Sequence, residues 1–158
     1  GSITIDGEQL EDMTEKKLSL YRRKHLGYIF QMYNLIPNLT LRENIEVGAY
    51  LSDKALDTDE ILNTLGLSDH ADKKPNQLSG GQQQRTSIGR ALIKNPDILL
   101  CDEPTGALDQ KTGHEVLELL KEINKSGKTV IIVTHDEGIA KMTNRIITIS
   151  DGKIVGDN

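Results

Sequence analysis

The segment Leu78–Gln82, with the sequence Leu-Ser-Gly-Gly-Gln, carries the clearest chemical signal in the chain. Its two adjacent glycines lack a Cβ, so the backbone of a loop at this point can approach a ligand closely. A helix is predicted to begin at once and to extend to about Lys94, so that its unpaired N–H groups and the positive end of its dipole point into the same space. This arrangement predicts an anion site, and phosphate is the usual occupant of such sites.

A second signal stands at the end of an apolar run, where Ile98–Cys101 is followed by Asp102 and Glu103. A phosphate-binding helix start and a strand that ends in two carboxylates are together typical of nucleotide hydrolysis, in which catalysis is mostly positioning and charge stabilisation. Asp102 is the candidate magnesium ligand, through water, because Mg²⁺ gives up its water reluctantly. Glu103 is the candidate general base that polarises the attacking water.

Together these motifs resemble those of ABC-transporter ATPases, in which Leu78–Gln82 corresponds to the signature motif and Asp102-Glu103 to the Walker B pair. The resemblance implies that Gln31 opens the Q-loop and ligates magnesium through its amide. It also implies that His135 is the switch histidine, which contacts the γ-phosphate of ATP and holds Glu103 in place.

The same resemblance implies an ATP site shared between two subunits, with the signature motif facing ATP held by the partner and a D-loop aspartate linking the two sites. ATP and Mg²⁺ are the implied cofactors. The predicted catalytic residues are Glu103, His135 and Gln31; the predicted cofactor-binding residues are Ser79, Gly80, Gly81, Gln82 and Asp109; the predicted magnesium ligands are Asp102 and Gln31.

The charge and the apolar content of the chain exclude some classes of protein. The chain has 158 residues, 27% of them charged, and a formal net charge of -5. Nucleic-acid-binding domains are usually basic, so we expect no nucleic-acid partner. No apolar run approaches the roughly 20 residues that span a membrane, and no signal peptide is recognisable at the N-terminus. We therefore expect a cytoplasmic protein that reaches the inner face of the cell membrane through a permease partner.

The elements that position these residues alternate between strand and helix, which predicts an α/β fold with a mainly parallel sheet. The resemblance makes it a partial P-loop NTPase (RecA-like) core with an inserted α-helical subdomain that carries the signature motif. We expect residues 1–36 to form the remnant of the core up to the Q-loop, 37–94 the helical subdomain, and 95–158 the Walker B, D-loop and H-loop part of the core.

Local patterns predict several elements in detail. Ile98–Asp102 and Thr129–Val133 are apolar runs of the kind expected for strands buried on both faces. Thr40 begins a capping-box sequence, so a helix should start near Leu41 and carry Ile45 and Leu51. A second helix should be capped by Thr58 or Asp59, and His70 should lie on the surface.

One motif is missing, because no Gly-x-x-x-x-Gly-Lys-Ser/Thr loop (Walker A) occurs between a strand and a helix. Gly127-Lys128-Thr129 matches the last three residues of this motif, but it precedes a strand, and Glu122 occupies the position of the first glycine. We therefore expect the chain to begin after the Walker A segment and to be inactive as an ATPase alone. A gene or cloning fragment, a proteolysed or partly described domain, and a naturally reduced protein all remain open.

The segments Arg22–Gln31, Asn34–Thr40 and Asp102–Asp109 resemble the macrolide-export and lipoprotein-release group of the family. The predicted function is thus an ATP-binding and ATP-hydrolysing subunit that powers transport through a partner permease and pairs with a second ATP-binding subunit. The alternative is a non-hydrolysing interaction module that supplies only the signature half of a composite site. A DNA-repair or chromosome-structure ATPase is disfavoured, because such proteins carry long coiled coils or zinc modules.

Overall fold

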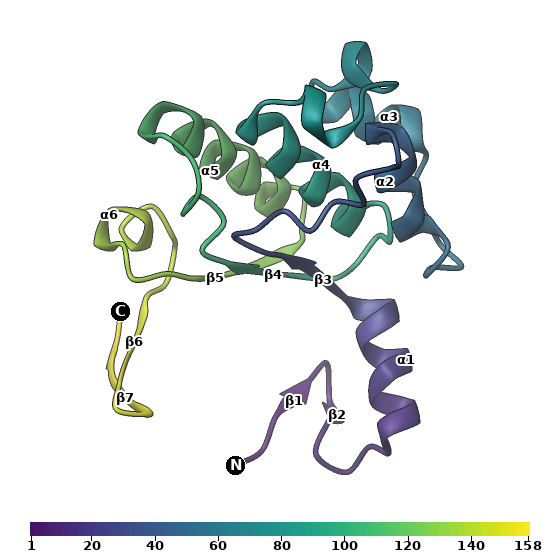
Figure 1. The fold of residues 1–158 in the computed structure, drawn as a ribbon. Coiled ribbons are helices and arrows are strands. Elements are labelled where there is room, and N and C mark those ends of the chain that lie inside the picture. Colours follow the sequence, from purple (N-terminus) through teal and green to yellow (C-terminus); the bar gives the residue numbers. More distant parts are fainter.

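A three-stranded parallel sheet forms the centre of the computed structural model, which describes residues 1–158 (Figure 1). Its strands are β3 (Leu26–Ile29), β4 (Ile98–Asp102) and β5 (Thr129–Val133), in the order β3-β4-β5. Ile29 pairs with Cys101, and Cys101 pairs with Ile132, so the three carboxyl ends lie at one edge. The prediction of an α/β fold with a mainly parallel sheet is confirmed.

Two antiparallel hairpins extend from this centre. β1 (Thr4–Ile5) pairs with β2 (Glu8–Gln9), and β6 (Ile147–Ser150) pairs with β7 (Lys153–Asp157). The second hairpin turns at Asp151-Gly152, where both residues have positive φ (47° and 73°), as a tight two-residue turn requires. Helix α1 (Glu15–His25) connects the first hairpin to β3.

The remaining helices form a layer on one side of the sheet (Figure 1). They are α2 (Leu41–Ala49), α3 (Thr58–Thr64), α4 (Gly80–Leu92) and α5 (Gln110–Lys125), with 3₁₀ turns η1 (Ser68–His70) and η2 (Pro75–Gln77) between α3 and α4. The short helix α6 (Glu137–Ala140) follows β5. The core between the layers is apolar and includes Ile45, Ile88, Leu99 and Val116, none of which is exposed. None of these helices combines the length and the apolar character that crossing a membrane requires.

The contact between α2 and α4 depends on a glycine. A Cβ on Gly48 would lie 2.2 Å from the backbone oxygen of Arg90, which cannot move without displacing α4. We therefore expect Gly48→Ala to destabilise the fold by about 1–3 kcal/mol, the usual cost of overpacking a core. The measurement is the free energy of unfolding in urea. Glu46→Ala, which on the same helix removes only a half-exposed ion pair with Arg42, should change it by less than about 1 kcal/mol, and a Gly48→Ala protein as stable as its parent would contradict the prediction.

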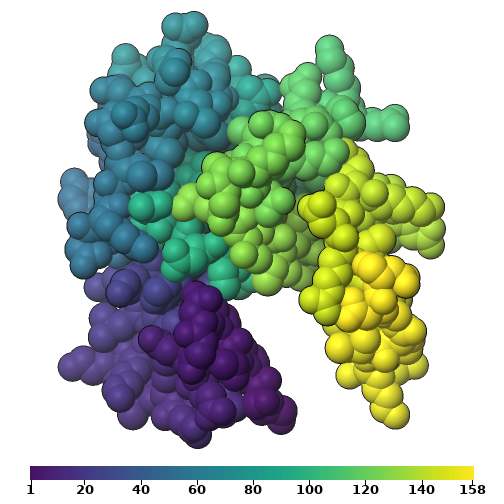
Figure 2. Space-filling model, turned by 180° about the vertical axis from the view of Figure 1, so that it is seen from behind, coloured from purple at the N-terminus to yellow at the C-terminus, as the bar shows by residue number.

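The second face of the sheet differs from the prediction. β4 and β5 were expected to be buried on both faces, but Ile131 and Val133 of β5 are 45% and 62% exposed, and Tyr28 of β3 is 39% exposed. The expectation is wrong because α4 and α5 pack on the same face and no helix of the chain covers the other. Figure 2 shows the N-terminal segment and the β6–β7 hairpin projecting separately from this side.

Three smaller expectations also need correction. Leu51 was placed on α2, but the helix ends at Ala49 and Leu51 is 43% exposed. Helix α3 is capped by Asp57 and not by Thr58 or Asp59, because the Asp57 side chain accepts from the backbone N–H of Glu60. His70 was expected on the surface but is half-buried, since it packs against the start of α4.

Candidate functional site

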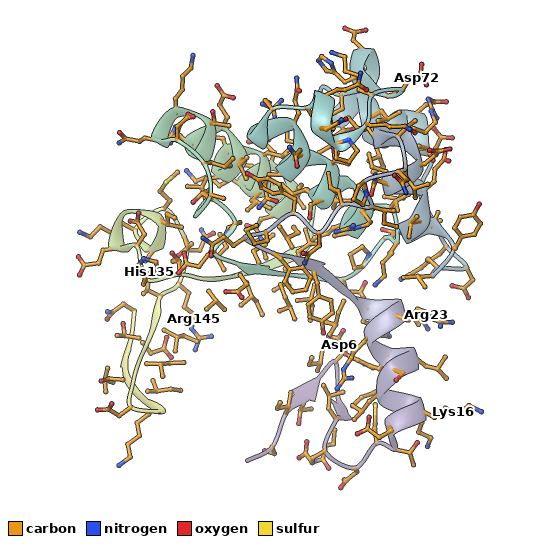
Figure 3. The ribbon with its side chains drawn as sticks, in the orientation of Figure 1. Asp6, Lys16, Arg23, Asp72, His135 and Arg145 are labelled. Atoms are coloured by element: carbon orange, nitrogen blue, oxygen red, sulfur yellow. The ribbon has the colours of Figure 1, made fainter.

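The predicted site residues of the sheet follow the carboxyl ends of its three strands. Gln31 lies two residues beyond Ile29, and Glu103 two beyond Cys101, and these strand residues are direct partners in the sheet. His135 follows β5 and is labelled in Figure 3 near α6. The structure therefore brings these side chains to one edge, which is where open α/β sheets bind their ligands.

Glu103 is held by three hydrogen bonds at this edge. Its Oε1 accepts from the backbone N–H of His135 at 2.9 Å and lies 2.5 Å from the Nδ1 of the same residue. Its Oε2 accepts from the hydroxyl of Thr134 at 2.9 Å. Glu103 also has a positive φ of 44°, a backbone conformation that a residue with a side chain rarely adopts outside functional or tightly constrained positions.

The charge of Glu103 follows from these contacts. Partial burial raises the pKa of this carboxyl, but the hydrogen bonds from His135 and Thr134 outweigh that effect and leave the pKa below its usual value. Glu103 is therefore ionised at neutral pH, as a general base must be. His135 donates from Nδ1, because an ionised carboxylate can only accept; its side chain is 91% exposed and its Nε2 remains open to a ligand.

Asp102 and Gln31 can contribute to a magnesium site only together with a bound ligand. Asp102 ends β4 with an exposed side chain that has no hydrogen-bond or ion-pair partner in the chain. The exposed side chain of Gln31 lies against Gly106, where a Cβ would meet Gln31 Nε2 at 2.7 Å. No cluster of three His, Cys, Asp or Glu side chains exists. One free carboxylate with an amide fits Mg²⁺ nevertheless, because this ion is usually held by one or two carboxylates plus substrate phosphates.

The Leu78–Gln82 segment begins a helix, and its glycines are the first two helical residues of α4. Ser79 is the cap: its hydroxyl accepts from Gln82 N–H at 3.2 Å, and Gln82 Oε1 accepts from Ser79 N–H at 3.0 Å. The backbone N–H groups of Gly80 and Gly81 have no partner in the chain. These two donors at a helix N-terminus are suited to an anion, although the expected glycine loop is in fact helix.

Close packing also explains Gly81, and it leaves little room at Gly80. A Cβ on Gly80 would lie 3.1 Å from Tyr33 Oη, and a Cβ on Gly81 would lie 2.4 Å from Thr112 Cγ2. Thr112 is itself fixed by Asp109, whose carboxylate accepts from the hydroxyl and the backbone N–H of Thr112 and so caps α5. These hydrogen bonds lower the pKa of Asp109. Gly81 of the predicted signature motif therefore packs against Thr112, the same residue that Asp109 of the predicted D-loop holds by hydrogen bonds.

Sequence patterns missed several residues of this region. Thr134, which bonds Glu103, and His70, whose Nε2 lies 3.2 Å from Gln82 Nε2, were not singled out as partners. Gln84 is fully buried and bonds the backbone beside two predicted site residues. The signal available was its position on the face of α4 that also carries the buried Ile88, where an apolar residue is the rule.

Comparisons with known proteins agree with one another. The family model described as ABC transporter matches residues 1–106. The macrolide export ATP-binding/permease protein MacB of Burkholderia pseudomallei (strain K96243) is 49% identical over 99% of this chain, and that of Bartonella henselae is 46% identical over 100%. The chain spans 25% of the length of each of these curated relatives.

Solved structures show the same similarity. The dimeric bacterial ABC transporter cassette MJ0796 has a TM-score of 0.84 and 42% sequence identity, covering 100% of this chain and 72% of that one. A dimeric post-hydrolysis state of the same cassette, bound to ADP and Pi, matches with the same values.

Proposed function

This chain belongs to the ABC transporter family and is MacB-like in sequence, and from that premise we propose that it binds and hydrolyses ATP to power transport through a partner permease. It would do so at the cytoplasmic face of a membrane, paired with a second ATP-binding subunit. The named relatives support this proposal, because MacB is an ATP-binding/permease protein and MJ0796 is a dimeric cassette.

The observation that carries the proposal is the Glu103 network. An ionised carboxylate, fixed by His135 and Thr134, follows directly after the unpartnered Asp102 at the carboxyl edge of a parallel sheet. Glu103 would orient and deprotonate the attacking water. His135 would hold that carboxylate through Nδ1 and present Nε2 to the γ-phosphate. Fixing both groups before the reaction removes the cost of ordering them during it.

Asp102 and Gln31 would hold the magnesium ion of the nucleotide. Mg²⁺, when bound, neutralises charge on the β- and γ-phosphates. Across the dimer, the capped start of α4 would direct the N–H groups of Gly80 and Gly81 and the hydroxyl of Ser79 toward the γ-phosphate held by the partner. Gln82 would keep Ser79 in position, and Asp109 would connect the two sites. The free donors at the start of α4 support this assignment.

The 158 residues contain no Walker A loop, and we propose that the main grip on the β- and γ-phosphates is supplied by a polypeptide segment outside them. We use the term Walker A assembly for any complex or longer protein in which this chain works together with such a loop. The alternative function, a module that docks and binds nucleotide in trans without hydrolysing it, shares the start of α4 but makes no use of the Glu103 network.

Titrating fluorescent ATP with Mg²⁺ into the folded chain tests whether this chain needs a Walker A loop from elsewhere to bind ATP. We expect no binding at micromolar concentration by the chain alone, and micromolar binding with hydrolysis by the Walker A assembly. Circular dichroism on the same sample establishes that the chain is folded. Micromolar binding by the chain alone would refute the need for a Walker A loop, and binding without hydrolysis by the assembly would favour the alternative function.

A further inference from the structure

The amide of Gln84 joins the backbone beside two of the site residues. Its Nε2 donates to the carbonyl oxygen of Phe30 at 3.4 Å and to that of Pro104 at 2.5 Å. Phe30 directly precedes Gln31, and Pro104 directly follows Glu103. We propose that Gln84 is a positioning residue that holds Gln31 and Glu103 at a fixed separation, an inference that rests on the proposed function of these two side chains.

The chemistry of the contact fixes the orientation of the amide. Both neighbours are carbonyl oxygens, which only accept, so the NH₂ group of Gln84 must face them. The other amide atom, Oε1, is buried and has no hydrogen-bond partner in the chain. Burying an amide with an unpaired oxygen lowers the stability of the fold. The two hydrogen bonds that Nε2 donates offset this cost.

The hydrogen bond from Gln84 to Pro104 restrains the turn that orients the Glu103 side chain. This turn leaves β4 through the positive φ of Glu103 and closes with a hydrogen bond from Gly106 N–H to Glu103 O at 3.0 Å. A residue in the left-handed region persists when its surroundings hold it there. Gln84 supplies one of those restraints, at the carbonyl of Pro104 next to the strained residue.

Helix α4 makes a second tie to the segment after Gln31. Arg90 donates from Nη1 to Asn34 O at 2.6 Å and from Nη2 to Tyr33 O at 3.0 Å. Helix α4 thus bonds the backbone on both sides of Gln31, at Phe30 and at Tyr33-Asn34, and also bonds the turn after Glu103 at Pro104. A shift of α4 caused by nucleotide at its N-terminus would therefore move the carbonyls beside Gln31 and Glu103 directly.

The test compares two buried amides in the Walker A assembly. Gln84→Met keeps an unbranched side chain of similar length but removes the donor, and Asn44→Leu removes an equally buried amide that bonds only residues 36–40. Both variants should lower the melting temperature. Only Gln84→Met should reduce kcat, by about tenfold through misplacement of the reacting groups, with the KM for ATP changed less than about threefold. Equal kcat loss in both variants would reduce Gln84 to a structural role and overturn the proposal.

A second readout separates this inference from the proposed function. In the folded chain, amide hydrogen exchange at Gly106 should accelerate in Gln84→Met and not in Asn44→Leu, whereas exchange at Leu39, whose N–H bonds Ile36 O, should show the reverse. Unchanged exchange at Gly106 overturns the positioning role whether or not ATP is hydrolysed. Faster exchange with no hydrolysis by the parent assembly would instead count against the proposed function.

Combining Gln84→Met with Glu103→Gln supplies the last control. If Gln84 acts by holding Glu103 at a fixed separation from Gln31, its replacement should cause much less than a further tenfold loss of kcat once the carboxylate is gone, because residues that act as a unit are not additive. A full additional tenfold loss in the double variant would place the effect of Gln84 elsewhere and contradict the inference.

Discussion

Glu103→Gln is expected to reduce ATP hydrolysis by the Walker A assembly by about 10²- to 10⁴-fold, the usual contribution of a positioned general base. Glutamine keeps the shape of the side chain and can still accept from Thr134 or His135, but it cannot take a proton from water. Nucleotide binding should therefore persist. The measurement is kcat by phosphate release alongside ATP affinity by fluorescence.

The matched control is Glu137→Gln on α6, where the side chain is 91% exposed and makes only an ion pair with Lys141 at 3.9 Å. It should hydrolyse ATP at the parental rate. Hydrolysis within about threefold of the parent in Glu103→Gln would remove this residue as the base and, with it, the observation on which the proposed function depends.

The same substitution has a consequence for stability against pH. Hydrogen bonds hold the pKa of Glu103 in the folded chain below its ordinary value of 4.5, so the folded state favours the ionised carboxylate. This contribution is fully present above the unfolded pKa and is lost as the pH falls through the folded pKa. The difference in unfolding free energy between parent and Glu103→Gln should accordingly be constant near pH 7 and shrink below about pH 4.5. A difference independent of pH would contradict the network.

Gly81→Ala is expected to lower ATP hydrolysis by about 10²-fold, because the new Cβ would meet Thr112 Cγ2 at 2.4 Å and push the start of α4 away from α5. A displacement of about 1 Å at a positioning element has a cost of that order. The loss cannot come from helix propensity, since alanine favours a helix more than glycine does. The measurement is kcat in the Walker A assembly together with the melting temperature.

Thr112→Ser is the partner substitution that separates packing from ligand contact. It removes the offending methyl group and retains the hydroxyl that donates to Asp109. In the Gly81→Ala/Thr112→Ser protein, stability should return toward that of the parent. Recovery of kcat as well would assign Gly81 to packing alone, whereas persistent loss would support close approach of its backbone to phosphate. Full hydrolysis by the single Gly81→Ala variant would contradict both.

Local sequence patterns were sufficient to predict most of the elements. The capping box of Thr40 and Glu43 forms and begins α2 at Leu41, and the apolar runs Ile98–Asp102 and Thr129–Val133 form the strands β4 and β5. Both depend on residues close together in the chain, so the local sequence contains the information. Gln31, Glu103 and His135 lie at one edge because each follows a strand of the parallel sheet, and parallel strands share the edge at which they end.

The sequence by itself determined which elements form and which edge of the sheet carries the chemical groups, because caps, periodicity and strand direction are local properties. Only the tertiary structure decided which sheet face is covered, why Gly81 must lack a side chain, and how Glu103 and Gln84 are held. The contacts that settle these points join residues far apart in the chain, 32 positions for His135 N–H and Glu103 and 54 for Gln84 and Phe30. Such contacts depend on how helices and strands pack, which no local pattern encodes.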